Sequence, residues 1–269
     1  MKKICVINQK GGVGKTTVVV NLAAGLARAG KKVLLIDLDP HASLRSCLPV
    51  REELKNIYHI LLENVDPNEC IHKVAINLDL IASDEHLAEA EMALVNESAR
   101  EYVLAKKLRS IKKYDYVIID CPPSLGLLSQ NAMIYSQEVF VTAATDVLGV
   151  IATKKMTKTV SYINDMFTHD LQITKIIPTM YDKRNKICKE SLAEIQNHFY
   201  ERVTNPIHVN SKLKEAAKRK CSIFAFAPKN RASDDFRELV RNVLYDESDV
   251  DTSVSVDIKE GKRVSVASK

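Results

Sequence analysis

The sequence predicts a single α/β domain built on a mostly parallel, twisted sheet with helices on both faces. Several short runs are apolar throughout rather than alternating, which is typical of strands that are covered on both faces. Segments of helix length separate these runs, and strands that are joined through helices pair in parallel. The chain has 269 residues, of which 46% are hydrophobic and 27% charged, enough to bury one substantial core.

The first elements read as a strand, a loop, a helix and a second strand. Residues 4–7 are an apolar run that breaks into a segment rich in glycine. A helix is expected from Thr16 to about Gly30, which is suited to end it, and the apolar residues 33–36 form the next strand. This order predicts parallel pairing of the two strands through a right-handed crossover.

The remaining chain continues the pattern up to residue 245. Further strands are expected at residues 78–82, 116–119, 139–143 and 173–177, with helix-length segments such as 89–110 between them. No internal repeat and no linker rich in glycine or proline divides residues 1–245, which we interpret as one domain. Residues 246–269 are polar and lack a packing period, so we predict a disordered tail.

Composition restricts the compartment and the partners. Six cysteines without a C-x-x-C pair argue against a structural zinc site and against a disulfide framework, and fit reduced thiols in the cytoplasm. Neither a signal peptide nor an apolar run of membrane-spanning length is visible, so we expect a cytoplasmic protein without stable membrane insertion. The net charge of +5 permits an anionic partner without requiring one.

The glycine-rich segment has the composition of a phosphate-binding loop. It reads Lys10-Gly11-Gly12-Val13-Gly14-Lys15-Thr16-Thr17. Glycines let backbone N–H groups approach phosphate oxygens, and the helix N-terminus adds the positive end of its dipole. Lys15 is placed to reach the β- and γ-phosphates, and the Thr16 hydroxyl to bind Mg²⁺. The usual G-x-x-x-x-G-K-[ST] pattern would need glycine where Gln9 stands, and Lys10 is an additional lysine before the glycines.

Aspartates follow two of the predicted strands. The second strand ends in Asp37-Leu38-Asp39-Pro40, and the strand at residues 116–119 is followed by Asp120. Carboxylates at the carboxyl ends of parallel strands, beside a phosphate loop, favour a magnesium role, although Asp37 could instead cap the following helix. His41 is expected to be solvated and not catalytic.

The nucleotide base is expected to be adenine. A guanine-reading Asn-Lys-x-Asp motif is missing, because Asn185-Lys186-Ile187 is followed by Cys188.

These segments together resemble the ParA/Soj partition ATPases of the ParA/MinD superfamily. The resemblance rests on the loop, on both aspartate-bearing strand ends, and on later stretches at residues 178–184 and 214–231, so it covers residues 1–245. It implies an ATPase that uses ATP and Mg²⁺ and forms a homodimer around them. The family commonly continues Asp-Pro with Gln-Gly-Asn, whereas this chain has His41-Ala42-Ser43.

The resemblance also implies roles for individual residues. Lys10 would reach the phosphates bound by the partner subunit, Lys15 would act within its own loop, and Asp39 would position or activate the attacking water. Four residues would surround Mg²⁺: Thr16 as a ligand, Asp37 and Asp120 mainly through its waters, and Asp39. The nucleotide-binding residues would comprise the whole loop from Lys10 to Thr17 together with Met180 and Asp182.

Three functional classes remain open: a nucleotide-switched DNA-binding ATPase, a MinD-like membrane-cycling ATPase, and a metabolic ATP-dependent enzyme or metallocluster carrier. The C-terminus lacks the bulky apolar face of a membrane-binding helix, and Cys121 alone does not make a cluster site. Residues 202–241 carry ten basic and four acidic side chains, which favours an anionic partner.

Of the three classes, we favour the DNA-binding ATPase, which the family resemblance supports. We expect the ATP-bound dimer to contact nonspecific double-stranded DNA through Lys218, Arg219, Lys220 and Arg231, and to associate with the nucleoid. Because no helix-turn-helix precedes the first strand, the contact should be largely indifferent to sequence. The resemblance implies a ParB-like partner that stimulates hydrolysis.

Overall fold

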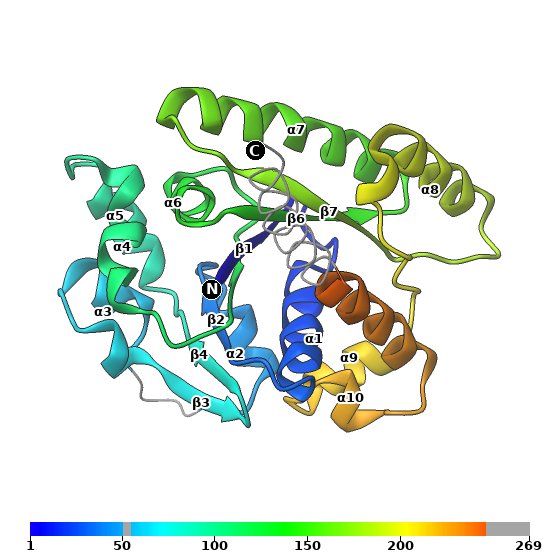
Figure 1. The fold of residues 1–269 in the computed structure, drawn as a ribbon, viewed down its shortest axis with the longest axis horizontal. Coiled ribbons are helices and arrows are strands. Elements are labelled where there is room, and N and C mark those ends of the chain that lie inside the picture. The colour runs from blue at the N-terminus through cyan, green and yellow to red at the C-terminus, as the bar shows by residue number, and fades with distance from the viewer. Residues whose placement is uncertain (51–54, 246–269) are drawn as a thin grey trace, which may run out of the picture.

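The computed structural model describes residues 1–50 and 55–245, which contain one seven-stranded sheet (Figure 1). Its strand order is β3-β4-β2-β5-β1-β6-β7, and every pairing is parallel except that between β3 and β4. The strands are β1 (Lys2–Ile7), β2 (Val33–Asp37), β3 (His72–Ala75), β4 (Leu78–Ile81), β5 (Tyr116–Asp120), β6 (Glu138–Ala144) and β7 (Gln172–Thr179).

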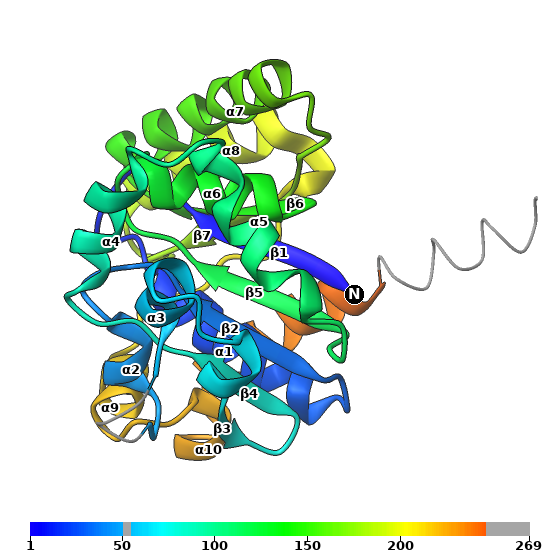
Figure 2. The same cartoon turned by 90° about the vertical axis from the view of Figure 1, so that its left-hand side faces the viewer.

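Helices cover both faces of the sheet, as Figures 1 and 2 show. One face packs against α1 (Lys15–Arg28), α2 (Ser43–Cys47), α9 (Ser211–Lys218), α10 (Ile223–Phe226) and a helix at residues 231–245. The other face packs against α3 (Ile57–Leu62), α4 (Leu87–Leu94), α5 (Val103–Lys107), α6 (Leu127–Tyr135), α7 (Val147–Phe167) and α8 (Lys186–Phe199).

Strand residues alternate between two cores. In β1, Ile4 and Val6 belong to the core beneath α1, whereas Cys5 and Ile7 belong to the core beneath α6 and α7. All four are fully buried, which explains why the strand has no polar alternation. The predicted α/β fold with helices on both faces is confirmed.

Two expectations about the elements are wrong. The first and second strands are parallel but do not pair with each other, because β5 lies between them. Residues 89–110 are not one helix: α4 ends at Leu94, and the chain turns at Ala99, whose φ is 52°. The side chain of Asn131 in α6 stabilises this break by bonding to the Leu104 N–H and the Arg100 carbonyl, at 2.9 Å each.

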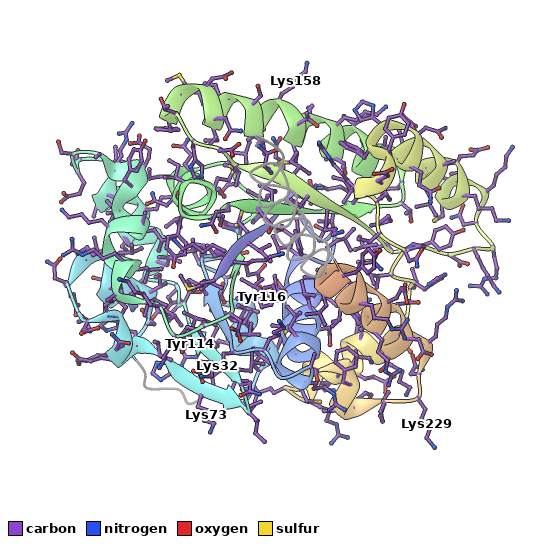
Figure 3. All side chains as sticks on the ribbon, viewed as in Figure 1. Lys32, Lys73, Tyr114, Tyr116, Lys158 and Lys229 are labelled. Carbon is purple, nitrogen blue, oxygen red and sulfur yellow. The ribbon has the colours of Figure 1, made fainter. Side chains whose placement is uncertain are left out.

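Exposed lysines lie around the periphery. Figure 3 shows Lys158 of α7 and Lys229, just before the last helix, pointing away from the body of the protein. No helix in the described part of the chain combines the length and the apolar character needed to cross a membrane. The predicted tail at residues 246–269 lies outside the described residues.

Candidate active site

The glycine-rich loop follows β1 and is held by the side chains of Asn8, just after β1, and Thr179, at the end of β7. Asn8 donates through Nδ2 to the Thr142 carbonyl at 2.6 Å, and its Oδ1 accepts from the Lys10 N–H at 2.9 Å. The Thr179 hydroxyl donates to the Val13 carbonyl at 2.8 Å. These bonds shape the loop independently of α1, whose first N–H groups have no partner within the helix and can bind an anion.

Left-handed backbone at two glycines allows this shape. Gly12 has φ 71° and Gly14, which precedes α1, has φ 84°. A side chain at either position would be strained, since only glycine adopts this region without cost. The sequence prediction of a glycine loop between a strand and a helix is thus confirmed.

Lys15 is the first residue of α1 and is only 7% exposed. Burial lowers the pKa of its ammonium, while the nearby groups Asp120, Cys121 and Asp39 raise it. An ammonium held beside carboxylates at the mouth of a phosphate loop is a preplaced cation for phosphate oxygens.

Asp37 caps a helix. Its Oδ1 accepts from the Asp39 N–H and its Oδ2 from the Leu44 N–H in the first turn of α2, both at 3.0 Å. The capping role, which the sequence left as an alternative, is therefore present. Burial, together with the charge of Asp120, raises the pKa of Asp37. Its role beside Mg²⁺ stays a prediction.

Asp120 has no such partners. It is 1% exposed, and neither carboxylate oxygen accepts a hydrogen bond of ordinary geometry from the described residues. Burial raises its pKa to about 7, although the Thr16 hydroxyl and the Lys15 ammonium lower it. A buried carboxylate without donors is costly unless a cation satisfies it, so these residues fit Mg²⁺.

The raised pKa of Asp120 makes stability depend on pH. Because the folded state holds this proton more tightly than the unfolded state, stability is highest below the unfolded pKa, near 4, and falls as pH rises through about 7. The asparagine of Asp120→Asn cannot ionise. We therefore expect this variant to lack the loss of folding stability, on the order of 2–4 kcal/mol between pH 5 and pH 8, that the nucleotide-free wild type shows.

Thermal unfolding at both pH values checks this expectation. The melting temperature of Asp120→Asn relative to the wild type should rise by roughly 4–16 °C from pH 5 to pH 8, at 2–4 °C per kcal/mol. The exposed Asp165→Asn is the matched control and should leave the pH profile unchanged. An equal difference at both pH values would refute the assignment.

Asp39 contacts the residue that departs from the family pattern. Its Oδ1 accepts from the His41 N–H at 3.0 Å and lies 2.8 Å from His41 Nδ1. The His41 side chain is 82% exposed, so it is solvated as expected, but it also contacts the candidate catalytic carboxylate. Ala42 stands where the family has glycine and has a left-handed backbone with φ 51°.

Lys10 is paired within its own chain. Its Nζ lies 2.7 Å from both carboxylate oxygens of Asp146, and Asp146 caps α7 by accepting from the Gly149 N–H at 2.7 Å. Burial raises the pKa of Asp146, but its hydrogen bonds to Lys10 and to backbone N–H groups, together with the charge of Lys10, outweigh burial and lower the pKa. The predicted role of Lys10 in a partner subunit is not tested by this geometry.

A mainly apolar cavity of about 400 Å³ opens beside the loop. It is lined by Gly14, Thr17 and Met180 on one side and by residues of the segment 207–217 on the other. Met180 has φ 57°, a backbone strain that often marks a ligand site. The contribution of residues 207–217 to this cavity was not predicted from the sequence, since no local pattern there indicates a ligand site.

Asp182 does not line this cavity. It pairs with Arg184 at 2.8 Å, an interaction that lowers its pKa to about 2, and it lines a smaller neighbouring pocket. A contact between Asp182 and a nucleotide stays a prediction.

The candidate DNA-binding residues lie at the two ends of α9. Lys218, Arg219 and Lys220 end the helix, and Lys220 adopts a left-handed backbone there, with φ 52°. Arg231 lies beside the start of α9, where Asn210 bonds to Asn230 at 2.8 Å. All four are exposed, and none forms an ion pair with the described acidic residues. An eight-residue helix separates the two groups by about 12 Å.

Comparison with known proteins identifies the family. Residues 1–173 match the family model described as an AAA domain. The chain is 36% identical over 247 residues to the sporulation initiation inhibitor protein Soj of Bacillus subtilis, a match covering 90% of this chain and 98% of Soj. It belongs to the ParA/Soj family of ATPases. This ParA/Soj protein is also 33% identical to the chromosome partitioning protein ParA of Myxococcus xanthus, covering 90% of this chain and 87% of that one.

Solved structures share the fold of this ParA/Soj protein. Apo McdA of Cyanothece superposes with a TM-score of 0.82 at 22% identity, covering 90% of this chain and 99% of McdA. A Mycobacterium smegmatis protein described as cobyrinic acid a,c-diamide synthase, with bound ADP and magnesium, superposes with a TM-score of 0.72 at 31% identity. That match covers 82% of this chain and 91% of the other. The family and fold predicted from the sequence are confirmed.

Proposed function

We propose that this ParA/Soj protein hydrolyses ATP with Mg²⁺, dimerises around the nucleotide, and in that state binds nonspecific double-stranded DNA. Hydrolysis, stimulated by a ParB-like partner, releases the DNA and so positions DNA or another cargo on the nucleoid in the cytoplasm. The unpartnered carboxylate of Asp120 beside Lys15 and Thr16 is the observation that carries the nucleotide part of this proposal.

The side chains of the site promote hydrolysis mainly by holding charges and a water molecule in position. Lys15 neutralises phosphate oxygens, and Asp120 and the Thr16 hydroxyl hold the cation side of the site. Bound Mg²⁺ withdraws charge from the phosphate oxygens. Oδ1 of Asp39 accepts a hydrogen bond from the His41 N–H and contacts the His41 ring. Oδ2 is therefore left to orient a water molecule for in-line attack on the γ-phosphate.

Lys10 supports a link between dimerisation and hydrolysis. To reach a partner subunit it must leave Asp146, and a partly exposed pair of this kind contributes only about 1 kcal/mol or less. A phosphate group in the dimer would replace that partner readily. The ammonium then lies where charge develops during transfer.

The DNA-binding part rests on exposed cations that lack an acidic partner. In the same region Lys212, Arg237 and Arg241 are paired to Glu215, Asp234 and Glu238. The exposed basic groups without an acidic partner among the described residues include Lys218, Arg219, Lys220 and Arg231, which remain available for phosphates. A dimer doubles these contacts, so ATP should strengthen DNA binding.

DNA-binding assays with unrelated duplexes test this part. If about six phosphates are neutralised, log affinity should fall with log salt at a slope near −5. Replacing Lys218, Lys220 and Arg231 together by glutamate should abolish ATP-dependent binding, with dimer formation and basal ATP hydrolysis measured in parallel. Lys73→Glu, a single charge reversal at an exposed residue of β3, is the control for a reversal away from this surface. Binding that needs no ATP, or that survives the triple change, would contradict the proposal.

A second candidate is an ATP-dependent metabolic enzyme, favoured by the described activity of the Mycobacterium smegmatis neighbour. The same assays distinguish the two. A metabolic enzyme would show no salt-dependent DNA affinity and no gain from ATP.

A further inference from the structure

His208 lies between the nucleotide cavity and the residue expected to contact DNA. It lines the 400 Å³ cavity together with Gly14 and Met180, and it also lines the neighbouring 180 Å³ pocket together with Arg231. The side chain of His208 is 14% exposed, so its position is set by protein contacts.

Backbone pairing fixes His208 against the end of β7. The Ile207 N–H donates to the Pro178 carbonyl at 2.8 Å, and the Val209 N–H donates to the Tyr181 carbonyl at 3.0 Å. The Tyr181 ring packs edge-on against the imidazole, with ring centroids 5.1 Å apart. The imidazole therefore has little freedom to rotate.

The two nitrogens of the imidazole have different partners. Nδ1 lies 3.0 Å from Asp235 Oδ2, and the backbone N–H of His208 donates to the same oxygen at 3.0 Å. Nε2 contacts a guanidinium nitrogen of Arg231. Arginine only donates, so Nε2 must accept and the proton must reside on Nδ1, where it is donated to Asp235.

We propose that His208, oriented by Asp235, is a positioning residue that holds the Arg231 guanidinium in place for a DNA phosphate. The inference rests on the proposed DNA-binding function and adds to it two residues that do not themselves contact DNA. Arg231 is exposed and belongs to the first turn of the helix at residues 231–245. Without an acceptor at Nε2, the long Arg231 side chain would be mobile in the free protein. It would then lose rotamer freedom on binding DNA, and the affinity for DNA would fall.

Two substitutions at His208 separate the two hydrogen bonds. Gln places an acceptor near the position of Nε2, whereas Asn reproduces the Nδ1 donor to Asp235 but offers nothing to Arg231. At saturating ATP, His208→Asn should weaken DNA binding by about tenfold, as should Arg231→Ala, and His208→Gln should stay within about twofold of the wild type. ATP affinity is measured separately for each variant, because His208 also lines the nucleotide cavity.

The double variant distinguishes positioning from general damage. His208→Asn should have no further effect on DNA affinity once Arg231 is alanine, because the two residues act through one contact. If Arg231→Ala weakens binding but the His208→Asn and Arg231→Ala effects add, or if His208→Gln is as defective as His208→Asn, the positioning role is wrong and the DNA surface stands. If Arg231→Ala binds DNA like the wild type, Arg231 does not contact DNA and the positioning role is wrong, and the triple change decides separately whether the DNA surface stands.

One measurement on the wild-type protein needs no substitution. Nitrogen-15 NMR of the His208 ring should show the proton on Nδ1 and a bare Nε2 at neutral pH. A proton on Nε2 would overturn the proposal, since that nitrogen could not then accept from Arg231.

Discussion

Lys15→Ala is expected to lower ATP affinity by at least about 100-fold. The ammonium is nearly buried at the start of α1, where it neighbours Asp120 and Asp39. Its removal deletes the main cation for the phosphates and leaves those carboxylates facing them, so the loss combines a missing charge-assisted contact with repulsion. A factor of 100 corresponds to about 2.7 kcal/mol.

Calorimetric titration of the variant with ATP and Mg²⁺ measures this loss. Lys32→Ala, at an exposed lysine before β2, is the control and should bind ATP like the wild type. ATP affinity in Lys15→Ala within a few-fold of the wild type would move the nucleotide site away from this loop.

Asp39→Ala is expected to slow ATP hydrolysis by about 10²- to 10³-fold while ATP remains bound. The carboxylate is nearly buried, caps no helix, and holds one oxygen toward His41. Loss of a group that orients the attacking water raises the barrier more than it weakens the ground state. The ATP-bound dimer should therefore accumulate.

Phosphate release under single-turnover conditions and size-exclusion chromatography with ATP report the two effects. His41→Gln retains the carboxylate and removes only the exposed imidazole, so its turnover should stay within about threefold of the wild type. Normal turnover in Asp39→Ala would assign water activation to another residue.

Local patterns predicted most strands of the sheet. Continuous apolar runs placed all six predicted strands within two residues at each end, and the glycine loop between the first strand and the first helix was located correctly. β3 was missed, because its four residues are alternately half-buried and exposed at an edge of the sheet. β7 extends two residues beyond the predicted run at its C-terminal end, to Thr179.

Contacts between distant segments account for what the sequence could not show. β5 lies between β1 and β2, and this insertion brings Asp120 beside Asp37. Asp37 is satisfied by backbone N–H groups from the turn that follows it, whereas Asp120 is not. Two aspartates at the ends of similar apolar strands thus have different hydrogen-bond partners, for a reason that no local pattern contains.

The sequence of this ParA/Soj protein specifies its strands, its phosphate loop and the residue types at the site, because strand periodicity and glycine conformation depend on neighbouring residues. Which partners the side chains receive depends on strand order. Lys10 meets Asp146 from 136 positions away, Val13 meets Thr179 from 166, and His208 meets Asp235 and Arg231 through the packing of the last helix. Those pairings arise only when the sheet has assembled and helices cover its faces. Burial then leaves each polar group only the partners that the neighbouring strands and helices bring to it.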